Sequence, residues 1–282
     1  GWKFAGFISR LHRLGKVMPF LKIRDLDELW YEQAGEGPDL LIISGTGGDL
    51  RCHPNALETP LTRHFRVTSY DQRGLGRTSK PEGRYTMANY ADDAAAVMDA
   101  LELAPCPVLG ISFGGMVLQN LVVRHPEMVT HIALFCTSPG GAGGSSYPLH
   151  TLPPMEPEEK FRASMKLYDN RTTDDWFETE QAEMLRRRAD KSAFAGEPNF
   201  LRGSMGQLHA RSEHNCWEDL ANVTNPAFCA GGTNDEIATP EAMKNLADRL
   251  PNGELHLYDG GHMFFITVPE AYDDLRAFFS RQ

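Results

Sequence analysis

The chain has 282 residues, of which 41% are hydrophobic and 23% are charged. This is the composition of a globular protein with a sizeable core, and it excludes a disordered or fibrous chain. The net charge of −10 at pH 7 argues against nucleic acid as a partner, because such binding begins with a basic field over the phosphates. No apolar run has the length that a membrane-spanning helix needs, so we expect no transmembrane segment.

The cysteines are odd in number and include no Cys-x-x-Cys pair, which indicates neither a disulfide framework nor a zinc site. We therefore expect a reducing, cytoplasmic compartment and no bound metal. Three of the thiols lie in or beside apolar runs, where we expect small buried side chains rather than reactive ones. The five cysteines are Cys52, Cys106, Cys136, Cys216 and Cys229.

The first 24 residues carry six basic and no acidic side chains. Apolar residues recur there at helical spacing from Phe4 to Met18, which predicts a basic amphipathic helix. We interpret residues 1–19 as an N-terminal extension that docks on the body of the protein. An unstructured tail, a membrane-surface helix and an oligomer contact are the alternatives. The segment lacks the uninterrupted apolar core of a secretory signal.

Several short strands are expected next along the chain. Two are predicted at residues 20–24 and 29–32, the first buried strand at 40–43 and a further one at 65–70. The glycine-rich turn at 45–48 lacks the Gly-Lys-Ser/Thr ending of a phosphate-binding loop. Its free backbone N–H groups suit a developing oxyanion instead.

A second glycine-containing loop, at residues 71–79, includes Asp71 and Arg73. Opposite charges two residues apart in a turn more often fix the loop than act in catalysis. We therefore interpret both side chains as structural.

The run Val-Leu-Gly-Ile-Ser-Phe-Gly-Gly at residues 108–115 predicts a strand, a sharp turn and the start of a helix. Gly110 and Gly114 flank Ser112 two residues to either side. They leave room for a turn so tight that the serine backbone is strained and its hydroxyl projects from the edge of the sheet. Such a hydroxyl suits a nucleophile, although the five-residue pattern alone is only moderately specific.

Helices predicted at residues 90–103 and 114–124 alternate with the strands, and a further strand is expected at 129–135. This order indicates an α/β fold with a mainly parallel sheet covered on both faces. The alternation stops at residues 139–220, which begin with a glycine- and serine-rich stretch and contain no predicted strand. We expect a helical cap there. Its three consecutive arginines, Arg186–Arg188, can reach an anionic substrate, but we expect at least two of them on a solvated face.

The alternation returns after the cap, with strands predicted at 227–230 and 254–258, a helix at 240–249 and a closing helix at 268–279. The predicted organisation is a core formed by residues 20–138 and 221–282, with the cap of residues 139–220 inserted into it.

Ser112 needs a base to remove its proton and an acid to orient that base. Among the ten histidines, His262 follows a terminal strand directly, behind paired glycines. Asp235 follows the preceding strand, and parallel strands place it at the same edge of the sheet as Ser112. Asp259 and Glu236 are the alternatives for the acid, with Asp259 expected to shape its turn.

Four motifs in this order carry a resemblance to a known family. They are Asp-Gln-Arg-Gly-Leu-Gly-Arg-Thr-Ser at residues 71–79, Gly-Ile-Ser-Phe-Gly-Gly at 110–115, Gly-Gly-Thr-Asn-Asp at 231–235, and Gly-Gly-His ending at 262. From about residue 25 to 280 the chain resembles the α/β-hydrolase superfamily, in its lidded esterase, lactonase and carbon–carbon hydrolase branch. The resemblance implies an eight-stranded sheet, a helical cap inserted after the sixth strand, and Ser112, Asp235 and His262 as the catalytic triad.

The resemblance also implies an oxyanion hole formed by the backbone N–H groups of Thr46 and Phe113, in a turn supported by Gly45. Family members commonly have His-Gly in this turn, whereas this chain has Ser44 before the glycine, which is similar to the enol-lactonase relatives. Because the donors are backbone groups, the change need not cost activity. A serine nucleophile argues against dehalogenase and epoxide hydrolase chemistry.

We therefore expect a cofactor-independent serine hydrolase that cleaves a small carboxylic ester or lactone with an apolar portion. The alternatives on the same triad are carbon–carbon bond hydrolysis and haloperoxidase-like or acyl-transfer activity. From another class, the chain is compatible with a ligand-sensing protein on this fold, although a sensor has no need of all three side chains. The sequence is also compatible with a homo-oligomer.

Overall fold

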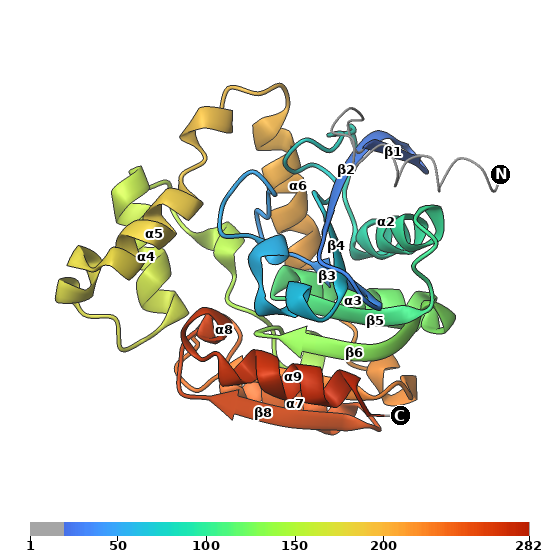
Figure 1. Ribbon diagram of the computed structural model, residues 1–282. Helices are drawn as coiled ribbons and strands as arrows, with labels where there is room; N and C mark the ends of the chain where they lie inside the picture. Colours follow the sequence, from blue (N-terminus) through green and yellow to red (C-terminus); the bar gives the residue numbers. More distant parts are fainter. Residues whose placement is uncertain (1–19, 282) are drawn as a thin grey trace.

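The computed structural model describes residues 20–281, which form one eight-stranded sheet in the order β1-β2-β4-β3-β5-β6-β7-β8 (Figure 1). Strand β2 pairs antiparallel with β1 and β4, and the remaining pairs are parallel. The predicted α/β fold is confirmed, while the predicted extension at residues 1–19 lies outside the described residues. The strands are β1 (Phe20–Ile23), β2 (Leu26–Ala34), β3 (Asp39–Ile43), β4 (Arg66–Tyr70), β5 (Cys106–Ile111), β6 (Val129–Phe135), β7 (Ala227–Gly232) and β8 (Gly253–Tyr258).

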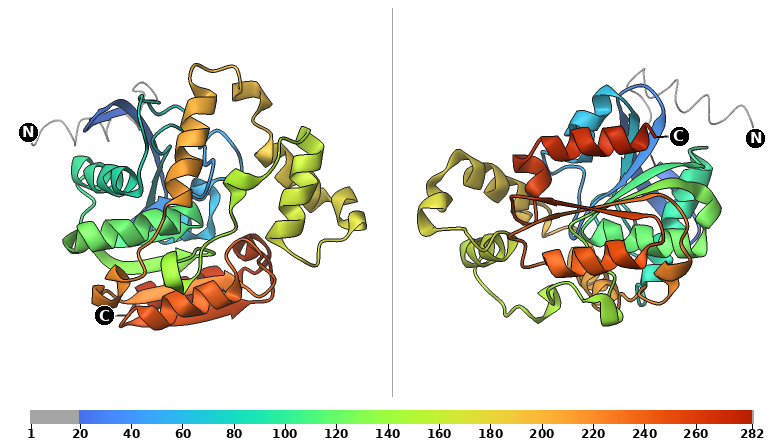
Figure 2. Two further views of the ribbon diagram at one scale, coloured as in Figure 1. Left: turned by 180° about the vertical axis from the view of Figure 1, so that it is seen from behind. Right: turned by 90° about the horizontal axis from the view of Figure 1, so that it is seen from below.

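The central strands are buried on both faces, and their side chains alternate between two hydrophobic cores. Leu41 and Ile43 of β3 belong to the core under α2, α3 and α7, whereas Leu40 and Ile42 belong to the core under α9. A strand period of two produces this division. Figure 2 shows α7 and α9 on opposite sides of the sheet. The helices of the core are α2 (Met87–Ala100), α3 (Phe113–Arg124), α7 (Pro240–Arg249), α8 (Phe264–Thr267) and α9 (Glu270–Phe279).

Two predicted helices differ from the observed ones at their starts. Helix α2 begins at Met87 rather than at residue 90, because Thr86 and Asn89 form a capping box in which each side chain accepts from the other's backbone N–H. The closing helix predicted at 268–279 corresponds to α9, which begins at Glu270, and the short helix α8 precedes it. Pro269 lies between the two helices, where it has no N–H to continue the hydrogen-bond ladder of α8.

Between β6 and β7 the chain forms α4 (Pro157–Tyr168), α5 (Glu180–Ala189) and α6 (Phe200–Ser212). Helices α4 and α5 project beside the sheet, whereas α6 lies against the body (Figures 1 and 2). This approach requires glycine at position 203, since a Cβ there would meet the carbonyl oxygen of Gly74. The treatment of residues 139–220 as a separate cap stays a prediction. None of the helices within residues 20–281 has the length and hydropathy to cross a membrane.

The side chain of Asp71, interpreted as structural, fixes its own loop. The carboxylate accepts hydrogen bonds from the backbone N–H groups of Leu50 at 2.7 Å and Arg77 at 2.9 Å. Burial raises the pKa of Asp71 to about 6. Gly76 is required beside it, because a Cβ there would overlap the carboxylate. Asp71 therefore fixes its own loop and connects that loop to the backbone at Leu50.

Arg73 also holds the fold together. Its guanidinium pairs with Asp93 of α2 at 2.7 Å and with Asp25 between β1 and β2 at 2.6 Å. The side chains of Arg73 and Asp93 are only 3% and 1% exposed. Asp93 also pairs with Arg24 at 2.7 Å, so loss of Arg73 would leave this buried carboxylate with one partly exposed partner.

We expect Arg73→Met to lower the free energy of unfolding in urea by about 1.5–3 kcal/mol, because Asp93 loses two hydrogen bonds from a charged donor and keeps only the partly exposed Arg24 as its partner. The control is Arg84→Met, which removes an exposed ion pair with Glu213 and should leave the unfolding midpoint unchanged. Unchanged stability of the Arg73 variant would contradict the structural interpretation.

Candidate active site

Ser112 occupies the turn between β5 and α3 in a backbone geometry that few residues adopt. Its φ is +54° and its ψ is −113°, which is strained for any residue other than glycine. A Cβ on Gly110 would meet the carbonyl oxygen of Gly114, and a Cβ on Gly114 would meet that of Ile43. The N–H of Ser112 donates to the carbonyl of Phe135 in β6 at 2.8 Å. Close backbone packing and this hydrogen bond therefore hold the strained turn.

The side chains of Ser112, His262 and Asp235 form a continuous hydrogen-bonded series. His262 Nε2 lies 3.0 Å from Ser112 Oγ, and His262 Nδ1 lies 2.7 Å from Asp235 Oδ2. The three residues are 8%, 5% and 1% exposed, respectively. Asp235 Oδ1 accepts from the backbone N–H groups of Ile237 and Ala238 at 2.7 and 3.0 Å. Both carboxylate oxygens are therefore engaged, which fixes the orientation of the imidazole.

His262 is also held by the end of α4. Its backbone N–H donates to the carbonyl oxygen of Tyr168, and the centres of the two rings lie 5.0 Å apart. A Cβ on Gly261 would meet the same carbonyl oxygen, so the glycine before the histidine permits this contact. Burial raises the pKa of Tyr168, which keeps its phenol neutral. Tyr168 was not predicted as a site residue from the sequence, because it is far from His262 along the chain and contacts it only in the folded structure.

The turn after β3 passes directly beside Ser112. A Cβ on Gly45 would lie 3.4 Å from Ser112 Cβ and 4.0 Å from its Oγ. Phe113 is the first residue of α3, and the first N–H groups of a helix have no partner within it. Within residues 20–281 no acceptor contacts the N–H of Phe113 or that of Thr46. These are the two groups predicted to bind an oxyanion, and that role stays a prediction.

Two buried glutamines hold this turn, and neither is among the site residues predicted from the sequence. Gln72 Nε2 donates to the carbonyl of Ser44 at 2.8 Å. Gln207 Oε1, on α6, accepts from the N–H of Gly47 at 2.7 Å. Gln72 lies within the motif at residues 71–79, which is a signal that could have revealed it. Gln207 has no local pattern, because its contact joins residues 160 positions apart.

The two alternative acids contact other groups. Asp259 is exposed and pairs with Arg171 at 2.6 Å, and Glu236 accepts from the side chain of Asn170 at 2.6 Å. Asp235, rather than either of these, contacts His262.

Of the three consecutive arginines of α5, only Arg187 is exposed, whereas Arg186 and Arg188 are half-buried. Arg186 pairs with Glu158 of α4 and Glu183 of α5, and Arg187 pairs with Glu183. Arg188 instead donates to the carbonyl of Pro54 at 2.9 Å, and its guanidinium lies 3.8 Å from the sulfur of Met263. This arginine is therefore close to the loop that carries His262.

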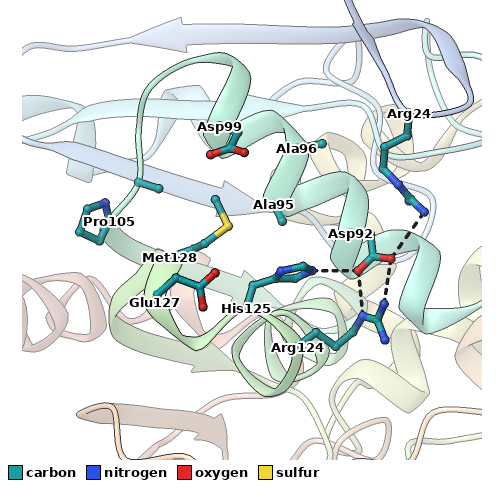
Figure 3. Close-up of a pocket in the computed structure, with 11 residues that line it drawn as sticks. Arg24, Asp92, Ala95, Ala96, Asp99, Pro105, Arg124, His125, Glu127 and Met128 are labelled. Atoms are coloured by element: carbon teal, nitrogen blue, oxygen red, sulfur yellow. Dashed lines mark hydrogen bonds and ion pairs between the residues drawn. The ribbon is translucent and has the colours of Figure 1, made fainter.

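A cavity of about 540 Å³ lies away from Ser112, beside α2 and the end of α3 (Figure 3). The Asp92 carboxylate at its wall pairs with Arg124 at 2.8 Å, His125 at 2.9 Å and Arg24 at 3.5 Å. Because this carboxylate already has three partners, we assign the cavity no catalytic role. Within residues 20–281 no group of three or more His, Cys, Asp and Glu is arranged to hold a metal ion.

Comparison with known proteins identifies the family to which this fold belongs. A family model described as the alpha/beta hydrolase fold matches residues 38–269. BpoC of Mycobacterium tuberculosis, named as a proposed non-heme bromoperoxidase, is 28% identical over 260 residues, which cover 86% of this chain and 94% of that protein. The poly(3-hydroxyalkanoate) depolymerase of Ectopseudomonas oleovorans is 27% identical over 238 residues, covering 82% of this chain and 80% of that protein.

Among solved structures, the enol-lactonase of Burkholderia xenovorans LB400 is similar to this chain with a TM-score of 0.77 and 23% identity. The match covers 93% of this chain and all of that one. At this identity the likeness supports the fold alone.

The arrangement of Ser112 and His262 makes a testable prediction about reactivity. A fluorophosphonate should label Ser112, and His262→Gln should slow the labelling about 100-fold or more, because the hydroxyl then lacks a base in hydrogen-bond reach. Intact-protein mass spectrometry over time gives the rate. His209→Gln, on the exposed face of α6, is the matched control and should label at the original rate. Equal rates for the two variants would show that His262 does not activate Ser112.

Proposed function

The chain belongs to the α/β-hydrolase family, and we propose that it hydrolyses a carboxylic ester or a lactone through an acyl-enzyme on Ser112. The observation that carries this proposal is the hydrogen-bonded series from Ser112 Oγ through the imidazole of His262 to the buried Asp235 carboxylate. A serine hydroxyl is a weak nucleophile by itself, and this is the arrangement that activates it.

In the proposed acylation, Ser112 Oγ attacks the acyl carbon while its proton passes to His262 Nε2. The bond between the acyl carbon and the leaving oxygen then breaks, and His262 returns the proton to that oxygen. The carboxylate of Asp235 holds the Nδ1–H tautomer and stabilises the imidazolium that forms between these two events.

In the proposed deacylation, a water molecule takes the place of the leaving hydroxyl group beside His262. That group departs with the alcohol of an ester or, from a lactone, stays attached to the acyl chain. His262 removes a proton from the water as the water oxygen attacks the acyl carbon, and the proton then returns to Ser112 Oγ as the ester bond to the enzyme breaks. The products are a carboxylic acid and an alcohol, or one hydroxy acid from a lactone. These steps use only the chain and water.

Negative charge develops on the carbonyl oxygen in both halves of the reaction. We propose that the N–H groups of Thr46 and Phe113 bind it, since Thr46 follows Gly45 beside Ser112 and both groups lack an acceptor. Preorganised donors of this kind stabilise the transition state without reorganising. Gln72 and Gln207 hold the turn that carries Thr46, and so act as positioning residues.

An apolar portion of the substrate fits the surroundings of His262. Met263 and Ile266, which follow the histidine, pack against the apolar cluster of α4 and α5. The name of the Ectopseudomonas relative agrees with cleavage of an acyl–oxygen bond. The name of BpoC keeps haloperoxidase-like chemistry as an alternative on the same residues.

We expect Asp235→Asn to lower kcat/KM for p-nitrophenyl esters by about 10³–10⁴-fold, because an amide favours the wrong histidine tautomer. The measurement is release of p-nitrophenol from acetate, butyrate and hexanoate esters. Asp259→Asn, in the same group of loops but exposed, is the control and should retain full activity. An Asp235→Asn variant that keeps more than about a tenth of the original kcat/KM would contradict the proposed role of this carboxylate.

The same ester series tests the reaction class. If Ser112 reacts with a fluorophosphonate but no ester or lactone is turned over, ester hydrolysis is wrong and carbon–carbon hydrolysis or haloperoxidase-like activity replaces it. If Ser112 does not react at all, the fold serves ligand sensing instead.

A further inference from the structure

Arg211 of α6 is a buried cation without an anionic partner. Among the arginines within residues 20–281, three form no ion pair: Arg63, Arg188 and Arg211. Of these, Arg63 is exposed and Arg188 is half-buried, whereas Arg211 is 5% exposed. A buried charge without a counter-charge is costly, so its retention needs a reason.

The contacts of Arg211 leave both charge and hydrogen-bonding capacity unused. Its Nη1 donates to the carbonyl of Tyr147 at 2.7 Å, and its Nη2 donates to the hydroxyl of Ser146. Both acceptors are neutral. The buried Nε has no acceptor among the described residues. Burial lowers the pKa of Arg211 to about 10, which still leaves the guanidinium charged at neutral pH.

Gln207 lies one helical turn before Arg211, on the same buried face of α6. It is 1% exposed, and its Oε1 is engaged by the N–H of Gly47. Its Nε2 has no acceptor among the described residues. The amide therefore presents an unmatched donor at the turn that passes beside Ser112, and α6 presents two such donors from neighbouring positions.

Arg211 is also connected to the residues around His262. The Ser146 hydroxyl that it contacts donates to the carbonyl of Ile237 at 3.0 Å, and the N–H of Ile237 donates to Asp235. The positive charge of Arg211 partly opposes the rise that burial causes in the pKa of the Tyr168 phenol, and the centre of the Tyr168 ring lies 5.0 Å from that of His262. Arg211 is therefore connected to Asp235 through two intervening residues, and Gln207 contacts the turn beside Ser112.

Resting on the proposed hydrolase function, we propose that the substrate carries a free carboxylate in addition to the ester or lactone group, and that Arg211 and Gln207 bind this carboxylate. A carboxylate only accepts hydrogen bonds, and its two oxygens can receive Arg211 Nε–H and Gln207 Nε2–H together. It also supplies the missing counter-charge, which a neutral carbonyl or hydroxyl does not.

Two pairs of matched esters test the proposal with the carboxylate on either side of the scissile bond. The first pair is mono(4-nitrophenyl) adipate and its methyl ester. The second is 4-carboxyphenyl hexanoate and its methyl ester. We expect kcat/KM for the charged member of at least one pair to exceed that of its neutral partner about tenfold or more, because a hydrogen bond to a charged group contributes about 1.5–3 kcal/mol.

Three variants separate binding from folding. Arg211→Met should lower the charged-to-neutral ratio of kcat/KM about tenfold or more. Gln207→Glu keeps an acceptor for Gly47 but places an anion beside the substrate carboxylate, so it should lower the same ratio. Arg187→Met, on the exposed face of the cap, is the matched control and should leave the ratio unchanged. A merely structural role for Arg211 predicts equal losses for the charged and neutral esters, which would overturn the proposal.

The result remains decisive if the Arg211 variant does not fold, since the preference of the unmodified enzyme and the Gln207→Glu ratio stand alone. Esters hydrolysed with charged-to-neutral ratios near one in both pairs would overturn the carboxylate site but keep the hydrolase. If no ester is hydrolysed, the proposed function fails, and protection of Ser112 from fluorophosphonate labelling tests the site directly. Adipate should then slow labelling of the unmodified protein, and dimethyl adipate should not. Absence of this difference would overturn the proposal.

Discussion

The structure around the candidate site depends on how closely three stretches of backbone approach at Ser112. The end of β3, the end of β5 and the first turn of α3 meet where a Cβ on either Gly110 or Gly114 would overlap a carbonyl oxygen. This close approach holds Ser112 at φ +54°. Its hydroxyl then lies within hydrogen-bond distance of His262, and α3 begins at the next residue. The strain, of the order of 1–3 kcal/mol, is offset by a sheet whose central strands are buried on both faces.

The parallel sheet extends this local constraint to residues far apart in the chain. Strands β5, β7 and β8 run in the same direction, so the loops that follow them gather at one edge. Ser112, Asp235 and His262 each come from such a loop. Their hydrogen-bond distances of 3.0 and 2.7 Å follow from this topology together with the two backbone N–H groups that fix Asp235. Helices α4 and α6 add a further support, because Tyr168 of α4 holds His262 and Gln207 of α6 holds the turn beside Ser112.

Features encoded by neighbouring residues could be predicted from the sequence, whereas features that depend on contacts between distant residues could not. Short apolar runs encode the strands, and the spacing of Gly110 and Gly114 encodes the turn that carries Ser112. Because the strands are parallel, the loops with Asp235 and His262 are expected at the same edge of the sheet as Ser112. The observed starts of α2 and α9 differ from the predicted ones, because the Thr86 capping box and Pro269 determine them. Neither residue is part of the apolar periodicity on which the predictions were based. Gln207 and Arg211 could not be predicted as site residues from the sequence, because they reach their partners only when α6 packs against loops far away in the chain.

The central claim is that Ser112 becomes covalently acylated during turnover, and trapping that species tests it most directly. A reaction with a p-nitrophenyl ester is quenched in acid within milliseconds, digested and examined by mass spectrometry. The account predicts that the peptide containing Ser112 gains the mass of the acyl group, and that the gain disappears once the substrate is exhausted. Turnover accompanied by an acyl group on another residue would contradict the account.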